Sequence, residues 1–183
     1  MSLLGPLFDR ALQLAAERMM RAWWKHETNP LNVLQKNVTK EAADYIKSYA
    51  SSAILYHDRK RHLLQALKAA PSEGLILEFG VHRGESIRGI AQDIAPRIVD
   101  GFDRFEGLPS GGGGTHWYKK QFNRDSQLPT VPRNTTLHKG SIQDTLPQYL
   151  ANKAETAAAF VHIDCDLYDS TKEVLKLLGD HLI

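Results

Sequence analysis

The segment that most constrains the fold is residues 75–86, which read LILEFGVHRGES. An apolar run carries Glu78 near its end, and two glycines follow four positions apart, Gly80 and Gly84, before a polar start at Ser86. This pattern is typical of a buried strand that turns tightly into a helix, whose free N–H groups can face a carboxylate or phosphate. It predicts an α/β fold with a ligand at this turn, although tight packing alone would also explain the glycines.

Strands and helices alternate through the rest of the chain. Apolar runs predict three further strands, at residues 98–102, 135–138 and 158–163. Amphipathic segments predict helices at residues 85–94, at residues 145–153 and from about Ser170. Pro147 would lie in the first turn of its helix, and Ser170 with Glu173 forms a capping-box pattern. The expected fold is a Rossmann-like, doubly wound and mostly parallel sheet.

The first 70 residues predict helices only. The amphipathic stretches are residues 6–25, a helix capped by Thr39 that ends near residue 49, and residues 52–69, with a break at Asn29 and Pro30. We therefore expect an N-terminal helical segment over residues 1–70 and a ligand-binding α/β domain over residues 71–183. The apolar face of these helices, including Trp23, favours packing or a homo-oligomer over a ligand site.

Composition narrows the functional class. The formal net charge is +2 and the one tight basic cluster, residues 59–61, lies in a helical pattern, where a solvated face is expected rather than a nucleic-acid contact. A single cysteine argues against an internal disulfide framework, and no apolar run approaches the length of a membrane span. We expect a cytoplasmic protein that binds neither nucleic acid nor membrane.

The last predicted strand, residues 158–163, would form an exposed apolar edge of a four-stranded sheet. Soluble proteins usually protect such edges. We therefore expect the chain to be a fragment or a truncated gene product.

Polar residues follow each predicted strand, where open parallel sheets bind their ligands. Asp103 ends the second strand, 25 residues after Glu78, and an acidic residue there can accept hydrogen bonds from both ribose hydroxyls of a nucleoside cofactor. A helix cap or surface turn is the alternative. Gly140 and Ser141 could lie beside a planar base, with Asp144 capping the next helix.

The fourth strand ends in Asp164 and Asp166. In extended backbone these side chains point the same way, and two adjacent carboxylates repel unless a cation or proton lies between them. Mg²⁺ suits such oxygen ligands, although one carboxylate could instead cap the next helix. Cys165 is expected to be a small buried residue. No zinc-like cluster of histidines is present, and His116 in the long loop is one of several possible bases.

Taken together, these segments resemble the class I S-adenosylmethionine-dependent methyltransferases, and most of all the macrocin and mycinamicin sugar O-methyltransferases. The resemblance covers residues 60–183 and rests on four motifs in order, EFGVHRGES, GFDRFEGLP, HKGS with DTLP, and HIDCDLY. It implies that Glu78, Gly80, Gly84 and Ser86 shape the cofactor pocket, Asp103 holds the ribose, and Gly140 and Ser141 flank adenine.

The same resemblance implies that Asp164 and Asp166 face the sulfonium and the acceptor, and that at least Asp164 binds Mg²⁺. Residues 105–132 would cover the acceptor, with Trp117 and Tyr118 packing on it. The family's further acidic pair, after a fifth strand, has no counterpart in this sequence.

The sequence thus predicts an S-adenosylmethionine-dependent O-methyltransferase for a small hydroxyl-bearing molecule such as a sugar, assisted by Mg²⁺. Candidate catalytic residues are Asp164, Asp166 and His116. Two alternatives stay open: a nicotinamide or nucleotide-sugar enzyme on a Rossmann sheet, which the glycine spacing disfavours, and a non-catalytic cofactor-binding domain.

Overall fold

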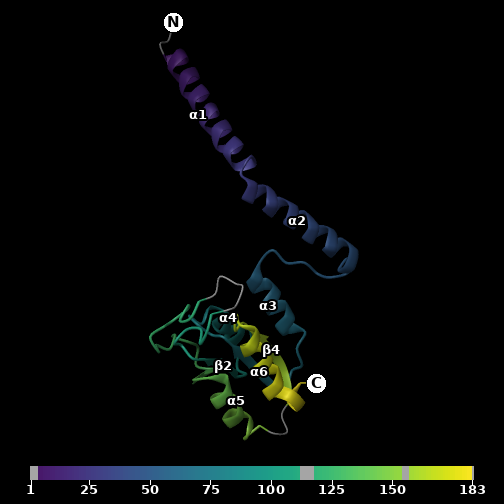
Figure 1. Cartoon of the computed structure of the whole chain (residues 1–183). Coiled ribbons are helices and arrows are strands. Elements are labelled where there is room, and N and C mark those ends of the chain that lie inside the picture. Colours follow the sequence, from purple (N-terminus) through teal and green to yellow (C-terminus); the bar gives the residue numbers. More distant parts are fainter. Residues whose placement is uncertain (1–3, 112–117, 154–156, 183) are drawn as a thin grey trace. The chain divides into compact units, whose positions relative to one another are not determined.

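The computed structural model describes residues 4–111, 118–153 and 157–182, and its described chain forms two compact units, Met1–Leu55 and Tyr56–Ile183 (Figure 1). The boundary of these units precedes the third helix, whereas the sequence predicted a division at residue 70. That helix packs against the α/β unit through Leu67. A functional division at residue 70 stays a prediction.

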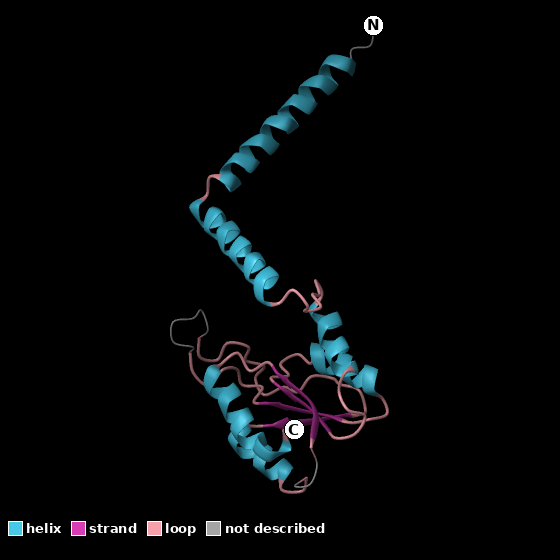
Figure 2. Cartoon of the chain, turned by 90° about the vertical axis from the view of Figure 1, so that its right-hand side faces the viewer, coloured by secondary structure: helices cyan, strands magenta, loops and turns pink. Residues whose placement is uncertain are grey.

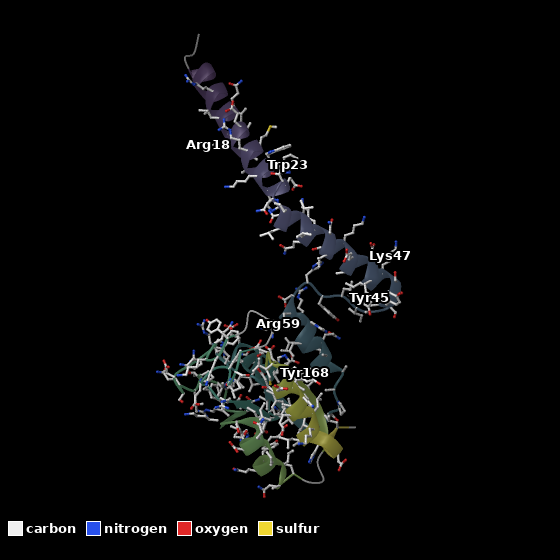
Figure 3. All side chains as sticks on the ribbon, in the orientation of Figure 1. Arg18, Trp23, Tyr45, Lys47, Arg59 and Tyr168 are labelled. Atoms are coloured by element: carbon white, nitrogen blue, oxygen red, sulfur yellow. The ribbon has the colours of Figure 1, made fainter. Side chains whose placement is uncertain are left out.

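The first unit consists of two long helices, α1 (Leu4–Glu27) and α2 (Pro30–Tyr49). The second helix begins nine residues earlier than predicted, because the Asn29 side chain accepts the N–H of Leu31 and Pro30 occupies the first turn. Thr39, the predicted cap, lies inside the helix and donates its hydroxyl to the Gln35 carbonyl. No residue of α2 is buried, and apolar side chains such as Trp23 and Tyr45 project outward (Figure 3).

The second unit is built on a four-stranded parallel sheet, as the alternating pattern predicted. The strands lie in the order β3-β2-β1-β4, with bounds β1 (Leu75–Phe79), β2 (Val99–Asp103), β3 (Thr135–Lys139) and β4 (Ala158–Ile163). Among the described strands β4 is therefore an edge, as expected. Every residue of β1 is buried, which explains why this interior strand is apolar except at Glu78.

Helices cover both faces of the sheet (Figure 2). One apolar cluster joins alternate strand residues to α3 (Arg59–Lys68) and α4 (Glu85–Ile94). The other cluster joins the opposite face of the strands to α5 (Ile142–Leu150) and α6 (Tyr168–Leu178), which is followed by a short 3₁₀ turn, η1 (Gly179–His181). This is the doubly wound arrangement that the sequence predicted.

Three helix starts in the second unit also differ from prediction. Asp58 accepts the N–H of Arg61, so α3 begins at Arg59 rather than near residue 52. Ser141, not Asp144, caps α5, which places Pro147 inside the helix rather than in its first turn. The capping box predicted at Ser170 does not form, because α6 already begins at Tyr168 with no side-chain cap.

Candidate active site

The carboxyl ends of the four strands meet at one cavity of about 780 Å³ in the second unit. Segments that follow all four strands contribute to its wall, as does the first turn of α3. Six of the predicted cofactor residues line it, namely Gly80, Ser86, Asp103, Gly140, Ser141 and Asp164. Glu78 and Gly84 lie behind the wall instead.

The turn from β1 into α4 depends on Gly80. Its φ is +90°, and a Cβ on this residue would lie 2.2 Å from the carbonyl oxygen of Asp164. Its N–H donates to the Phe102 carbonyl at 2.9 Å, which ties the turn to β2. The adjacent β1 and β4 chains can therefore approach closely only because this residue lacks a side chain.

Asp103 holds the same turn from the end of β2. Its Oδ2 accepts the backbone N–H groups of Val81 and His82 at 2.8 and 2.7 Å, and its Oδ1 accepts that of Phe105 at 2.7 Å. Oδ2 has both of its lone pairs engaged, whereas Oδ1 has one left, so these bonds leave room for Asp103 to accept one hydroxyl group. Asp103 thus organises the turn, a role that the sequence did not predict.

Glu78 is fully buried below the turn. Its Oε1 accepts the Ser86 hydroxyl at 2.5 Å, and the Nδ1 of His162 lies 3.9 Å from the same oxygen. Glu78 Oε2 and His162 Nδ1 are buried without a hydrogen-bond partner among the described residues. Through Ser86, which does line the cavity, this buried carboxyl group supports the first turn of α4.

The third strand end positions Ser141, which has two roles in the structure. It lines the cavity together with Gly140, and its side chain also accepts the N–H of Asp144 as the cap of α5. Its hydroxyl donates to Asp144 Oδ2 at 2.5 Å. The cap fixes the position of the strand end beside the cavity.

The carboxylate pair after β4 faces the cavity, but not for the reason predicted. Asp166 has a left-handed backbone, with φ of 60°, so the two residues are not in one extended strand. Burial raises the pKa of Asp166, and the nearby Asp164 adds to this effect. Asp164 forms an ion pair with Arg59, which lies 105 positions earlier in the chain and is labelled in Figure 3.

His82 and Cys165 on the wall also have shifted pKa values. Burial lowers the pKa of His82, and the positive charges of Arg83 and Arg124 lower it further, which favours a neutral imidazole. Its ring meets that of Phe122 edge to face at 5.4 Å between centroids. Burial also raises the pKa of the Cys165 thiol to about 12, with smaller contributions from nearby carboxylates. Cys165 therefore behaves as a small, inert, partly buried residue.

The long loop after β2 supplies part of the wall through Gly107, Leu108, Pro109 and Phe122. Its predicted acceptor residue Tyr118 is 65% exposed and does not line the cavity. His116 and Trp117 lie outside the described residues. Arg59 and Lys60 line the cavity without having been predicted to, and the basic cluster at residues 59–61 was the available signal for them. His82, one of the several histidines that the sequence offered as a base, lines it as well.

The predicted metal ligands do not form a cluster. No group of three or more His, Cys, Asp or Glu side chains suited to a metal ion occurs in the described ranges. No helix in the described part of the chain is long and apolar enough to cross a membrane.

Comparisons with known proteins define the class. The family model described as a methyltransferase domain matches residues 77–183, and the chain therefore belongs to this family. Together with the fold, this makes it a class I S-adenosylmethionine-dependent methyltransferase.

Two solved structures are similar in fold. The crystal structure of CalS11, a calicheamicin methyltransferase, is 21% identical, with 85% of this chain and 75% of that chain covered and a TM-score of 0.54. An apo structure of CalS11, described as a TDP-rhamnose 3'-O-methyltransferase of calicheamicin biosynthesis, is 23% identical at the same coverage, with a TM-score of 0.47. None of the curated protein sequences compared matches the chain.

Proposed function

We propose that this methyltransferase transfers a methyl group to a hydroxyl of a small molecule, with a sugar as the acceptor class. The observation that carries the proposal is the convergence of all four strand ends on one cavity. The macrocin-type motifs supply those strand ends, and the calicheamicin methyltransferase is a precedent for this fold in natural-product methylation. The macrocin and mycinamicin relationship is part of the proposal.

The residues of the cavity fit S-adenosylmethionine. This cofactor carries ribose hydroxyls, an adenine ring and cationic sulfonium and ammonium groups, and it supplies an electrophilic methyl group when bound. Asp103 Oδ1 retains acceptor capacity for one of these hydroxyls, and Asp166 is a carboxylate for the cationic end. Phe102 and Ile142 add apolar wall on which a planar base can pack. We keep Gly140 and Ser141 as the proposed adenine neighbours.

The chemistry requires alignment and removal of one proton. As the new oxygen–carbon bond forms and the sulfur–carbon bond breaks, the hydroxyl proton must pass to a base. Asp164 is engaged by Arg59, whereas Asp166 makes no ion pair within the described residues and has a raised pKa. We propose Asp166 as the first candidate for proton acceptance, with neutral His82 as the second. His116 remains a prediction from the sequence.

Magnesium does not fit the described donor set. Only Asp164 and Asp166 are available, and the guanidinium of Arg59 already contacts the first of them. We therefore assign no step of the reaction to a metal.

Calorimetric titration tests the proposal. We expect the chain to bind S-adenosylmethionine and its demethylated product. We do not expect it to bind NAD, the cofactor of the alternative hypothesis, a nicotinamide enzyme on a Rossmann sheet. Asp103→Asn should weaken cofactor binding about ten- to hundredfold, because a charged hydrogen-bond acceptor is lost. Asp93→Asn, the same change at an exposed position of α4 outside the cavity, is the control. Thermal melting of each variant separates lost binding from lost folding.

Methyl transfer to a panel of glycosides then separates an enzyme from a binding domain. Tight NAD binding with no response to S-adenosylmethionine would refute the proposed function. Cofactor binding without methyl transfer to any hydroxyl acceptor would favour the alternative hypothesis of a non-catalytic cofactor-binding domain.

A further inference from the structure

We propose that the acceptor is a phosphorylated sugar, whose phosphate binds to the cationic side chains of Lys60 and Arg83 at the mouth of the cavity. The inference rests on the proposed function, because it names the substrate class of that same site.

The basic cluster at residues 59–61 is the starting observation. Asp58 caps α3 directly before it, so all three basic residues fall in the first turn of that helix. Arg59 and Lys60 line the cavity while remaining exposed, and Arg61 does not line it. Arg83, from the turn between β1 and α4, is likewise exposed and lines the same cavity. Two elements distant in sequence therefore bring cations to one opening.

Several charged groups on the wall have no partner of opposite charge. Of its four carboxylates, Asp103 accepts three backbone N–H groups and Asp164 pairs with Arg59. Glu85 and Asp166 form no ion pair within the described residues. Arg104 lies 3.9 Å from the carboxylate of Glu106. Lys60 and Arg83 make no ion pair with any acidic side chain in the described ranges. These two cations are thus free to bind an anion that enters the cavity.

A phosphate matches these groups better than a neutral sugar does. It presents several charged oxygens, which suit both the fork of a guanidinium and the point charge of an ammonium. The cavity, at about 780 Å³, lies in the upper part of the range for ligand sites, so there is room for an acceptor beside the cofactor. The carboxylate of the cofactor is the competing ligand for these two cations.

Calorimetry with inorganic pyrophosphate tests the anion site without requiring turnover. The 183-residue chain is first saturated with S-adenosylhomocysteine and then titrated. We expect pyrophosphate to bind to this complex, and the double variant Lys60→Gln/Arg83→Gln to bind it at least about tenfold more weakly. Lys176→Gln removes an exposed lysine from α6, outside the cavity, and should leave binding unchanged.

Three results would overturn the inference. The first would be that the complex fails to bind pyrophosphate at millimolar concentration. The second would be that the double variant binds pyrophosphate as well as the parent chain does. In the third, pyrophosphate competes with S-adenosylhomocysteine, which would assign the cations to the cofactor carboxylate. None of these three results contradicts the proposed function, because the cofactor binds in each of them. If S-adenosylhomocysteine does not bind at all, the proposed function fails and the inference fails with it.

Methyl transfer provides the second readout. With a sugar phosphate and the methyl glycoside of the same sugar as paired acceptors, we expect kcat/KM to favour the phosphate by at least about tenfold. The double variant should remove this preference. Tighter binding of pyrophosphate than of inorganic phosphate would assign a diphosphate-linked sugar, and equal binding a monophosphate. Equal kcat/KM for both acceptors would refute a phosphorylated substrate.

Discussion

At the scale of single residues, the cavity wall is built on backbone conformations with positive φ. Gly80 has φ of +90°, and three non-glycine residues on the wall, His82, Phe122 and Asp166, have φ of 49°, 64° and 60°. Such conformations cost free energy in L-residues and persist where the surroundings enforce them. Here the enforcing contacts include the N–H of His82 on the Asp103 carboxylate and the N–H of Gly80 on the Phe102 carbonyl.

Gly80→Ala should therefore destabilise the chain by about 3 kcal/mol or more, since it combines backbone strain with a clash against the Asp164 carbonyl. Gly179→Ala is the matched control, because Gly179 has φ of +39° and open space around its missing Cβ. Strain alone should cost this control about 1–3 kcal/mol, because its φ of 39° and ψ of −112° lie in a region that L-residues rarely adopt. Urea unfolding at neutral pH measures both losses. Equal losses would mean that the β4 chain moves aside and that the contact at Gly80 is not rigid.

Local sequence predicted some of these residues and not others. Gly80 and Asp103 stand directly after apolar runs, so strand periodicity was enough to place them at the sheet edge. The Arg59–Asp164 pair joins residues 105 positions apart, and no local pattern carries that information. The left-handed backbone of Asp166 was also unpredicted, because it follows from how the chain leaves β4 rather than from residue type.

At the scale of elements, a polar network joins β2, β3 and α5. Asp100 of β2 pairs with the Nε2 of His138 on β3 at 2.8 Å and accepts the hydroxyl of Tyr149 on α5 at 2.9 Å. The His138 ring stacks on Phe102, with 4.5 Å between centroids. Burial raises the pKa of Tyr149 well above its usual value, and the charge of Asp100 and its hydrogen bond add to the shift. The network fastens an edge strand and a helix to the sheet interior.

Tyr149→Phe should lower the free energy of unfolding by about 1–2 kcal/mol at pH 8, because Asp100 loses a hydrogen-bond donor. A tyrosine whose pKa is raised by folding stabilises the native state below its unfolded pKa of about 10, and this contribution is lost as pH rises above that value. The deficit of the variant should therefore shrink between about pH 9.5 and 11. Urea midpoints across this range measure it, with exposed Tyr168→Phe as control. A deficit that stays constant with pH would exclude the linkage.

The elements themselves were predicted unevenly. The bounds of β1, α4 and β4 agree with prediction because their apolar periodicity is strong and glycine or polar residues flank them. Helix starts were less accurate, since several Ser, Thr, Asp and Asn residues compete as caps. Near α5, both Ser141 and Asp144 were suitable, and packing of Leu146 and Leu150 on the sheet selects the earlier start.

At the scale of the whole molecule, the two units differ in how they are held together. Both apolar clusters lie within the second unit, and α2 in the first unit has no buried residue. The α/β unit therefore contains the contacts that stabilise it. The exposed apolar residues of α1 and α2 are consistent with the homo-oligomer proposed from the sequence, which light scattering on the full chain can measure.

The two possible boundaries can be tested by truncation. A fragment of residues 56–183 retains α3, and we expect it to melt within a few degrees of the full chain and to bind S-adenosylhomocysteine within about twofold. A fragment of residues 71–183, which begins at the boundary predicted from the sequence, removes α3. It would lose the burial of Leu67, worth about 2 kcal/mol, together with the partly buried Leu63 and Leu64 and the Arg59–Asp164 ion pair. Calorimetric melting and titration of both fragments provide the comparison. Equal stability of the two fragments would mean that α3 does not stabilise the α/β unit and belongs with the N-terminal segment. Loss of cofactor binding by the longer fragment would show that α1 or α2 contributes to the cofactor site.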